Sequence, residues 1–134
     1  MTPSAVIDTH AAIWYLNADL RLSDRARRFI DEAGRRGMPV LITSISLVEV
    51  VYLCEKGRIP PASLVRLEEA LRLQDTVLRV ADLTMAVALA VGRVVRDEVP
   101  DMPDRIIAAT ALYFNVHVIS RDNKIRASSV ETLW

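Results

Sequence analysis

The stretch AVIDTHAAIWYL, residues 5–16, places a short apolar run before a single acid and a longer, mostly apolar segment after it. Residues 5–7 predict a buried strand, and residues 10–16 predict a helix that begins just after Asp8. Open parallel sheets bind ligands beyond the carboxyl ends of their strands, where Asp8 would lie. Asp is also a preferred helix N-cap, so a structural role explains Asp8 equally well.

The alternation of short apolar runs with helical patterns continues along the chain. Further strands are expected at residues 40–42, 77–80, 116–119 and 130–133. Further helices are expected at residues 24–35, 45–56, 61–73, 85–96 and 103–114. This order predicts an α/β fold, a three-layer α/β/α domain with a mainly parallel sheet of four to five strands. We expect residues 1–134 to form a single domain.

Composition says little about partners but something about location. The 134 residues carry a formal net charge of zero, which predicts no bulk attraction to nucleic acid or membrane. Apart from Lys56 and Lys124 the basic residues are arginines, which suit phosphate binding but equally suit a codon preference. The first residues lack a signal-peptide pattern, and no apolar run is long enough to span a bilayer. We expect a cytoplasmic protein with no membrane contact.

Four carboxylates lie against apolar runs: Asp8, Glu49, Asp104 and Asp122. An ionised carboxylate in an apolar interior is costly unless it is paired, protonated or bound to a metal. A parallel sheet could bring such residues together around a shared cation. Carboxylate oxygens are the ligands that Mg²⁺ and Mn²⁺ prefer, so either ion is the expected cofactor.

Local capping explains three of these four acids. Asp8 and Asp122 can cap the segments that follow them, and Asp101 can cap a helix that holds Asp104 in its first turn. Glu49 has no such role, because Ser44 is expected to cap its helix more than a turn earlier and its neighbours are apolar. Glu49 therefore favours a functional site most strongly.

The sequence resembles the PIN domain family, and within it the VapC-type toxins of toxin–antitoxin pairs. The matching stretches are Val6–Trp14, Ile45–Val50, Pro103–Ala111 and Ile119–Asp122. The resemblance spans the whole chain, with the four motifs in the right order. It implies a Mg²⁺- or Mn²⁺-dependent endoribonuclease that cleaves RNA, forms a homodimer and is held inactive by a cognate antitoxin protein.

The resemblance also implies roles for particular residues. The residues that match the family's acidic, catalytic and metal-binding quartet are Asp8, Glu49, Asp104 and Asp122, with Asp101 as an alternative ligand. Thr9 and Ser120 match small hydroxyl positions beside the site. Arg105 and Arg121 adjoin these acids and would contact phosphate or pair with the acids themselves. Asn123 and Lys124 stand where some members carry a further acid, which leaves open whether one metal or two are bound.

Two other functions remain compatible with the sequence. A Mg²⁺-binding phosphoacceptor domain also collects acids at strand ends, although it usually pairs two acids after its first strand. A catalytically silent PIN-like binding module would keep the fold for partner contacts. In that case Trp14, Tyr15 and Tyr52 could accept a partner segment in a groove, although core packing explains each of them as well.

Overall fold

The computed structural model describes residues 2–134, and the strands within them form one sheet. The strands are β1 (Ala5–Ile7), β2 (Val40–Thr43), β3 (Leu78–Ala81), β4 (His117–Ile119) and β5 (Thr132–Leu133). They run in the order β3-β2-β1-β4-β5, and every neighbouring pair is parallel. In register, Val6 of β1 lies between Leu41 and Val118. The predicted parallel sheet is confirmed.

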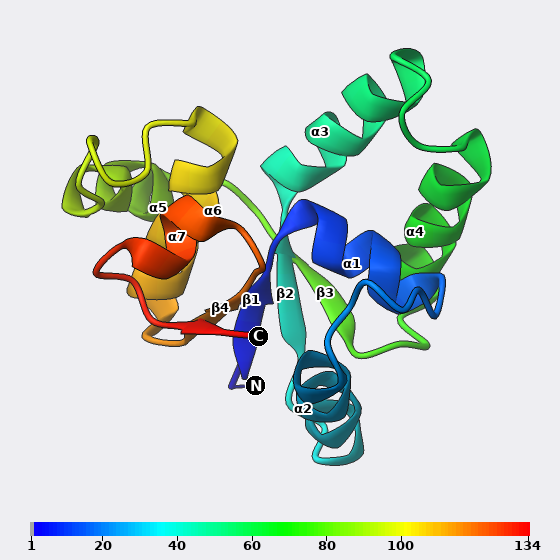
Figure 1. Cartoon of the computed structure of the whole chain (residues 1–134). Coiled ribbons are helices and arrows are strands. Elements are labelled where there is room, and N and C mark those ends of the chain that lie inside the picture. Colours follow the sequence, from blue (N-terminus) through cyan, green and yellow to red (C-terminus); the bar gives the residue numbers. More distant parts are fainter. Residues whose placement is uncertain (1) are drawn as a thin grey trace.

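Helices cover both faces of this sheet (Figure 1). The chain contains α1 (Thr9–Leu16), α2 (Asp24–Arg35), α3 (Ser44–Glu55), α4 (Pro61–Leu73), α5 (Met85–Ala90), α6 (Met102–Phe114) and α7 (Asn123–Ala127), with a short 3₁₀ helix, η1 (Val91–Arg93), after α5. Figure 1 shows α1–α4 on one side of the strands and α5–α7 on the other. The predicted three-layer α/β/α arrangement is confirmed.

Alternating side chains of the strands build a separate core on each face. On β1, Ala5 and Ile7 pack with residues of α1–α4, whereas Val6 packs with residues of α5–α7. Ile7 and Val6 are both completely buried. A strand that is apolar at every position is the pattern of a parallel sheet covered on both faces. None of the helices in residues 2–134 is long and apolar enough to cross a membrane.

Two local expectations are wrong. The helix expected to reach residue 96 ends at Ala90, continues as a 3₁₀ turn and becomes extended at Val94. Gly92 lowers helix stability there, and Val94, which follows the 3₁₀ turn in an extended conformation, is buried. Thr43, not Ser44, caps α3, because the Thr43 hydroxyl accepts a hydrogen bond from the backbone of Ser46 at 3.3 Å. The Ser44 hydroxyl instead accepts from the backbone N–H of Leu83.

Candidate active site

The acids meet where the sheet changes direction. The chain leaves β1 to form β2 on one side of it, and it returns later to form β4 on the other side. The crevice beyond the carboxyl ends of β1 and β4 is therefore a topological switch point, where parallel sheets bind ligands. Asp8 directly follows β1, and Ser120 directly follows β4.

A pocket of about 490 Å³ opens at this point. Its acidic lining residues are Asp8, Glu49, Asp101, Asp104 and Asp122. The other lining residues are Thr9, His10, Trp14, Arg121 and Asn123. The fold thus brings to one pocket all four acids of the predicted quartet and the predicted alternative, Asp101. They arrive from four separate parts of the chain.

Asp8 is held by hydrogen bonds on both carboxylate oxygens. Its Oδ1 accepts from the Ala11 backbone at 2.9 Å and caps α1, and its Oδ2 accepts from the hydroxyl of Ser120. Ser120 is fully buried, and its oxygen also accepts from the backbone N–H of Asp122 at 3.0 Å. Burial raises the pKa of Asp8, and the Ser120 hydrogen bond acts in the opposite direction. Ser120 therefore ties the first acid to the loop that carries the last.

Glu49 on α3 is held by a hydroxyl from α1. The Thr9 hydroxyl donates to Glu49 Oε1 at 2.6 Å and lies 2.9 Å from the hydroxyl of Ser46. Thr9 and Ser46 are both buried. Burial raises the pKa of Glu49, and the hydrogen bond from Thr9 partly offsets that rise. The acid without a local explanation thus has a partner forty residues away along the chain.

Asp104 lacks this support. It lies in the first turn of α6, where its backbone N–H donates to the N-cap Asp101 at 3.2 Å. Among residues 2–134, no group donates a hydrogen bond to its carboxyl. Burial raises the pKa of Asp104 to about 7, and the nearby charges of Asp101, Asp122, Glu49 and Asp8 add to the rise. Burial and four neighbouring acids thus all disfavour the charged form of Asp104.

The capping roles expected of the three acids Asp8, Asp101 and Asp122 are confirmed. Asp122 is exposed, and its Oδ1 accepts from the backbones of Lys124 at 2.9 Å and Ile125 at 3.0 Å, which caps α7. Asp8 and Asp101 cap α1 and α6. Capping and facing the pocket are thus compatible, because a helix N-terminus at the carboxyl edge of the sheet points its cap toward the crevice.

The two arginines beside the acids contact other groups than the acids. Arg105 donates to the carbonyl of Val94 through Nη2 at 3.0 Å and Nε at 3.3 Å, so it fixes the segment before α6. The guanidinium of Arg121 lies over the ring of Trp14, 4.5 Å from its centroid. Neither arginine forms an ion pair with an acid within residues 2–134. The expected pairing with the neighbouring acids is therefore absent.

Three residues of the pocket wall, His10, Trp14 and Asn123, are not assigned to the site by the acidic pattern. A signal for two of them exists, because His10 and Trp14 are four residues apart on a helix and so share a face. Their rings lie 5.9 Å apart. Asn123 begins α7, directly after the capping Asp122.

The chemistry of the lining suits a hard divalent cation. Its acidic donors are all carboxylates, and the buried hydroxyls of Thr9 and Ser120 orient two of them. Oxygen donors of this kind are preferred by Mg²⁺ and Mn²⁺ over softer metals. Within residues 2–134, no three side chains of the His, Cys, Asp and Glu types are grouped closely enough to hold a metal ion as they stand.

The fold and this acidic pocket define the class of protein. The family model of the PIN domain matches residues 5–129, and the chain belongs to the PIN domain family. A relative, Ribonuclease VapC22 of Mycobacterium tuberculosis (strain ATCC 25618 / H37Rv), is 28% identical over 124 residues, which are 92% of this chain and 91% of the relative. The expected resemblance to VapC-type proteins is confirmed.

Solved structures share the fold. The DNA-bound VapBC of Salmonella typhimurium matches with a TM-score of 0.72 and 20% identity over 98% of both chains. VapBC2 of Rickettsia felis, bound to a DNA fragment from its promoter, matches with a TM-score of 0.69 and 16% identity over 96% of both chains. A toxin–antitoxin complex from Klebsiella pneumoniae matches with a TM-score of 0.66 and 23% identity.

Proposed function

We propose that this chain is a metal-dependent endoribonuclease, the toxin of a type II toxin–antitoxin pair. The observation that carries the proposal is the convergence of five carboxylates on one pocket at the switch point of a PIN domain sheet. A relative that spans nearly the whole chain is named as a ribonuclease, which supports the reaction class. The substrate is then RNA, and the bond cut is a phosphodiester.

The cofactor that we propose is Mg²⁺ or Mn²⁺. Asp8, Glu49 and Asp104 would hold it directly or through water, and Asp122 would help to hold the same ion or a second one. Such an ion lowers the pKa of a bound water and stabilises charge on phosphoryl oxygens. Asp101, as the cap of α6, stays the alternative ligand.

The chain's own residues prepare this site in two ways. Ser120 and Thr9 fix one carboxylate oxygen each of Asp8 and Glu49, so these two side chains lose little freedom when they act. Partial burial and the neighbouring acids raise the pKa of Asp104 to about 7 in the metal-free protein, which favours its protonated form. Binding of a cation must displace that proton, which makes binding weaker as the pH falls.

The partners that we propose are RNA and a cognate antitoxin protein, with a homodimer as the functional form. Complexes named as VapBC or toxin–antitoxin share this fold. The chain also exposes apolar side chains on α3, where Val48 is 48% and Tyr52 is 58% exposed. Apolar surface of this kind suits a protein partner. We further propose that residues 1–134 act as one domain, in the cytoplasm.

The test is cleavage of total RNA and of a short single-stranded RNA by the purified chain, with Mg²⁺ and with EDTA. The wild type should cleave only with the metal. Asp8→Asn and Asp104→Asn should each reduce the rate at least about 10³-fold, because each removes a proposed ligand of the ion. Asp75→Asn, at an exposed acid outside the pocket, is the control and should cleave as the wild type does.

Three results would overturn the proposal. Cleavage by Asp8→Asn or Asp104→Asn at the wild-type rate would exclude the pocket as the catalytic site. A stable acyl phosphate formed from a small phosphodonor, without RNA fragments, would instead support the phosphoacceptor domain. Absence of Mn²⁺ binding by calorimetry would support the silent binding module.

A further inference from the structure

One wall of the acidic pocket carries a single fixed cation. Of the residues between 2 and 134 that line the pocket, five are Asp or Glu, and Arg121 alone is Lys or Arg. Bound RNA would add the negative charges of its phosphates to this excess, and one divalent cation would offset only two of them. A further positive group on the protein would therefore favour the entry of an RNA strand into this pocket.

The side chain of Arg121 is held in place for such a role. Its guanidinium lies 4.5 Å from the ring centroid of Trp14, a cation–π contact. Trp14 is only 6% exposed and meets Trp134 edge to face, with 6.0 Å between ring centroids, so the platform is rigid. The backbone around Arg121 is also fixed, because Ser120 is buried and Asp122 caps α7.

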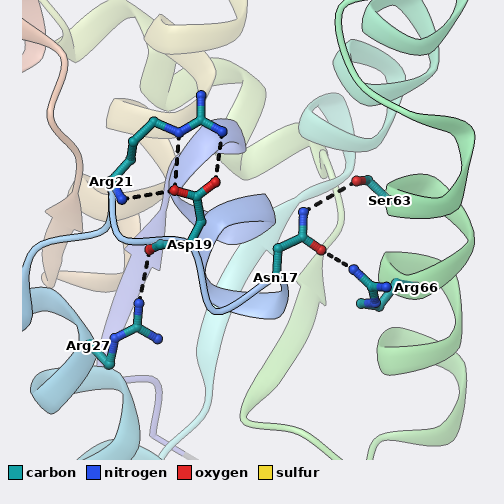
Figure 2. A network of polar contacts seen from close by, with 6 residues as sticks. All are labelled: Asn17, Asp19, Arg21, Arg27, Ser63 and Arg66. Carbon is teal, nitrogen blue, oxygen red and sulfur yellow. Dashed lines mark hydrogen bonds and ion pairs between the residues drawn. The ribbon is translucent and has the colours of Figure 1, made fainter.

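A second arginine, Arg21, also lies over the ring of Trp14, but it has a structural role. The guanidinium of Arg21 lies 5.2 Å from the Trp14 centroid. Figure 2 shows that Nε and Nη2 of Arg21 donate to the carboxylate of Asp19, at 3.1 and 2.7 Å, while Arg27 donates to the Asp19 carbonyl. The hydrogen bond from Arg21 contributes most to lowering the pKa of Asp19 to about 2. Arg21 is thus neutralised by its neighbour.

Arg121 has no such neighbour. Within residues 2–134, it forms no ion pair and donates no hydrogen bond. Its side chain is exposed at the pocket wall, and all of its guanidinium donors are free for a ligand. A stacked, unpaired guanidinium at the edge of an acidic pocket suits a phosphate, whose oxygens match the planar fork of donors.

We propose that Arg121, positioned by Trp14, binds a phosphate of the RNA strand next to the phosphate that is cut. The proposal rests on the proposed ribonuclease function and adds a substrate-binding residue to it. Arg121 would hold the strand in register across the acids, and it would act on binding of RNA more than on the bond-breaking step. An acidic protein segment on the same arginine is the competing partner.

The experiment measures binding of a labelled single-stranded RNA by fluorescence anisotropy at several salt concentrations. The Asp104→Asn chain is used so that the RNA stays intact, and Arg121→Ala, Arg121→Lys and Arg21→Ala are added to it separately. Loss of one phosphate contact should weaken binding roughly tenfold, and the slope of log K against log salt should fall by about 0.7. Arg121→Lys should restore the slope, and Arg21→Ala should change neither quantity.

Cleavage kinetics of the single variants complete the test. Arg121→Ala should raise KM for RNA more than it lowers kcat. If the wild type cleaves RNA but Arg121→Ala binds it with unchanged affinity and slope, this inference is wrong while the proposed function stands, and the acidic segment becomes the better partner. An equal fall in slope for Arg21→Ala would also refute it, because general charge would then explain binding. If the wild type does not cleave RNA, the proposed function fails and the inference fails with it.

Discussion

The two sides of the acidic pocket differ in how their carboxylates are supported. On the side of α1 and α3, Asp8 accepts a hydrogen bond from the hydroxyl of Ser120, and Glu49 accepts one from the hydroxyl of Thr9. Both hydroxyl-bearing residues are buried. On the side of α6, no donor in residues 2–134 reaches the carboxyl of Asp104, whose pKa rises to about 7. Hydrogen bonds to a carboxylate favour its charged form, and crowding by other acids opposes it.

Because of this difference, the two sides of the pocket have different roles. The supported pair keeps its orientation without a ligand, whereas Asp104 carries electrostatic strain that a cation would relieve. The supported side therefore supplies geometry, and the unsupported side makes the protein's stability and metal affinity depend on pH. A change on the supported side should leave the pH dependence intact, and a change on the unsupported side should leave the geometry of Asp8 and Glu49 intact. Three predictions test this separation.

The largest effect is expected from the supported side. Thr9→Val removes the hydroxyl that orients Glu49 but keeps the shape of the side chain. We expect cleavage or metal affinity to fall about 10- to 100-fold, the usual cost of losing a group that orients a metal ligand. Metal titration by calorimetry and a cleavage assay in Mg²⁺ measure the two quantities.

The matched control for this change is Thr110→Val on α6. Thr110 is also a buried threonine, and its hydroxyl donates to the carbonyl of Ile106 at 2.7 Å, away from the pocket. It should lose neither cleavage nor metal affinity. Equal losses in the two variants would mean that a buried hydroxyl matters only for folding. The claim that the Thr9 hydroxyl orients Glu49 would then be wrong.

The sequence predicts more of the acids than of what surrounds them. Asp8, Asp104 and Asp122 follow strands or begin helices, and such positions are visible from apolar patterns alone. The hydrogen-bond partners of Glu49 and Arg105 cannot be predicted from these patterns. Thr9 lies forty residues from Glu49, and the carbonyl that binds Arg105 belongs to Val94, in a stretch whose pattern predicts helix. Long-range contacts depend on packing, which the local pattern does not encode.

The same reasoning separates what could be predicted about the fold. The parallel orientation of the strands follows from apolar strands alternating with helices, and the structure confirms it. The end of α5 was beyond the pattern, because Val87 and Val91 continue a helical spacing through the break at Gly92. The choice of Thr43 over Ser44 as the cap of α3 also depends on tertiary contact, since the Ser44 hydroxyl binds the backbone of Leu83.

The second prediction concerns the unsupported side and the stability of the metal-free protein. The pKa of Asp104 rises from 3.8 to about 7 on folding, so the folded chain binds more protons than the unfolded chain between these values. Its free energy of unfolding should therefore fall as the pH rises from about 4 to about 7 and then level off. The full shift would be worth about 4 kcal/mol; because Asp104 is partly exposed and lies at the N-terminus of α6, where solvent and the helix dipole stabilise its charge, we expect a fall of at least about 1–2 kcal/mol.

Asp104→Asn isolates that contribution. In EDTA the variant should be more stable than the wild type by about 1–2 kcal/mol at pH 8 and equal to it near pH 4. Urea unfolding followed by circular dichroism at both pH values measures the difference, and Asp75→Asn again serves as the control. If wild type and Asp104→Asn lose stability in parallel between pH 4 and 8, the strain does not lie at Asp104.

The smallest effect is expected from Asp101, which both caps α6 and raises the pKa of Asp104 by its charge. Asp101→Asn keeps a side-chain oxygen for the backbone N–H of Asp104, and Asn caps helices as well as Asp does. Stability at pH 4 should therefore change by less than about 0.5 kcal/mol, whereas the pKa of Asp104 should fall below about 7. Carboxyl NMR titration of the metal-free chain measures that pKa directly. A pKa of Asp104 that does not move in Asp101→Asn would assign its rise to burial and to the charges of Asp122, Glu49 and Asp8, and the capping acid would then have no part in the electrostatics of the pocket.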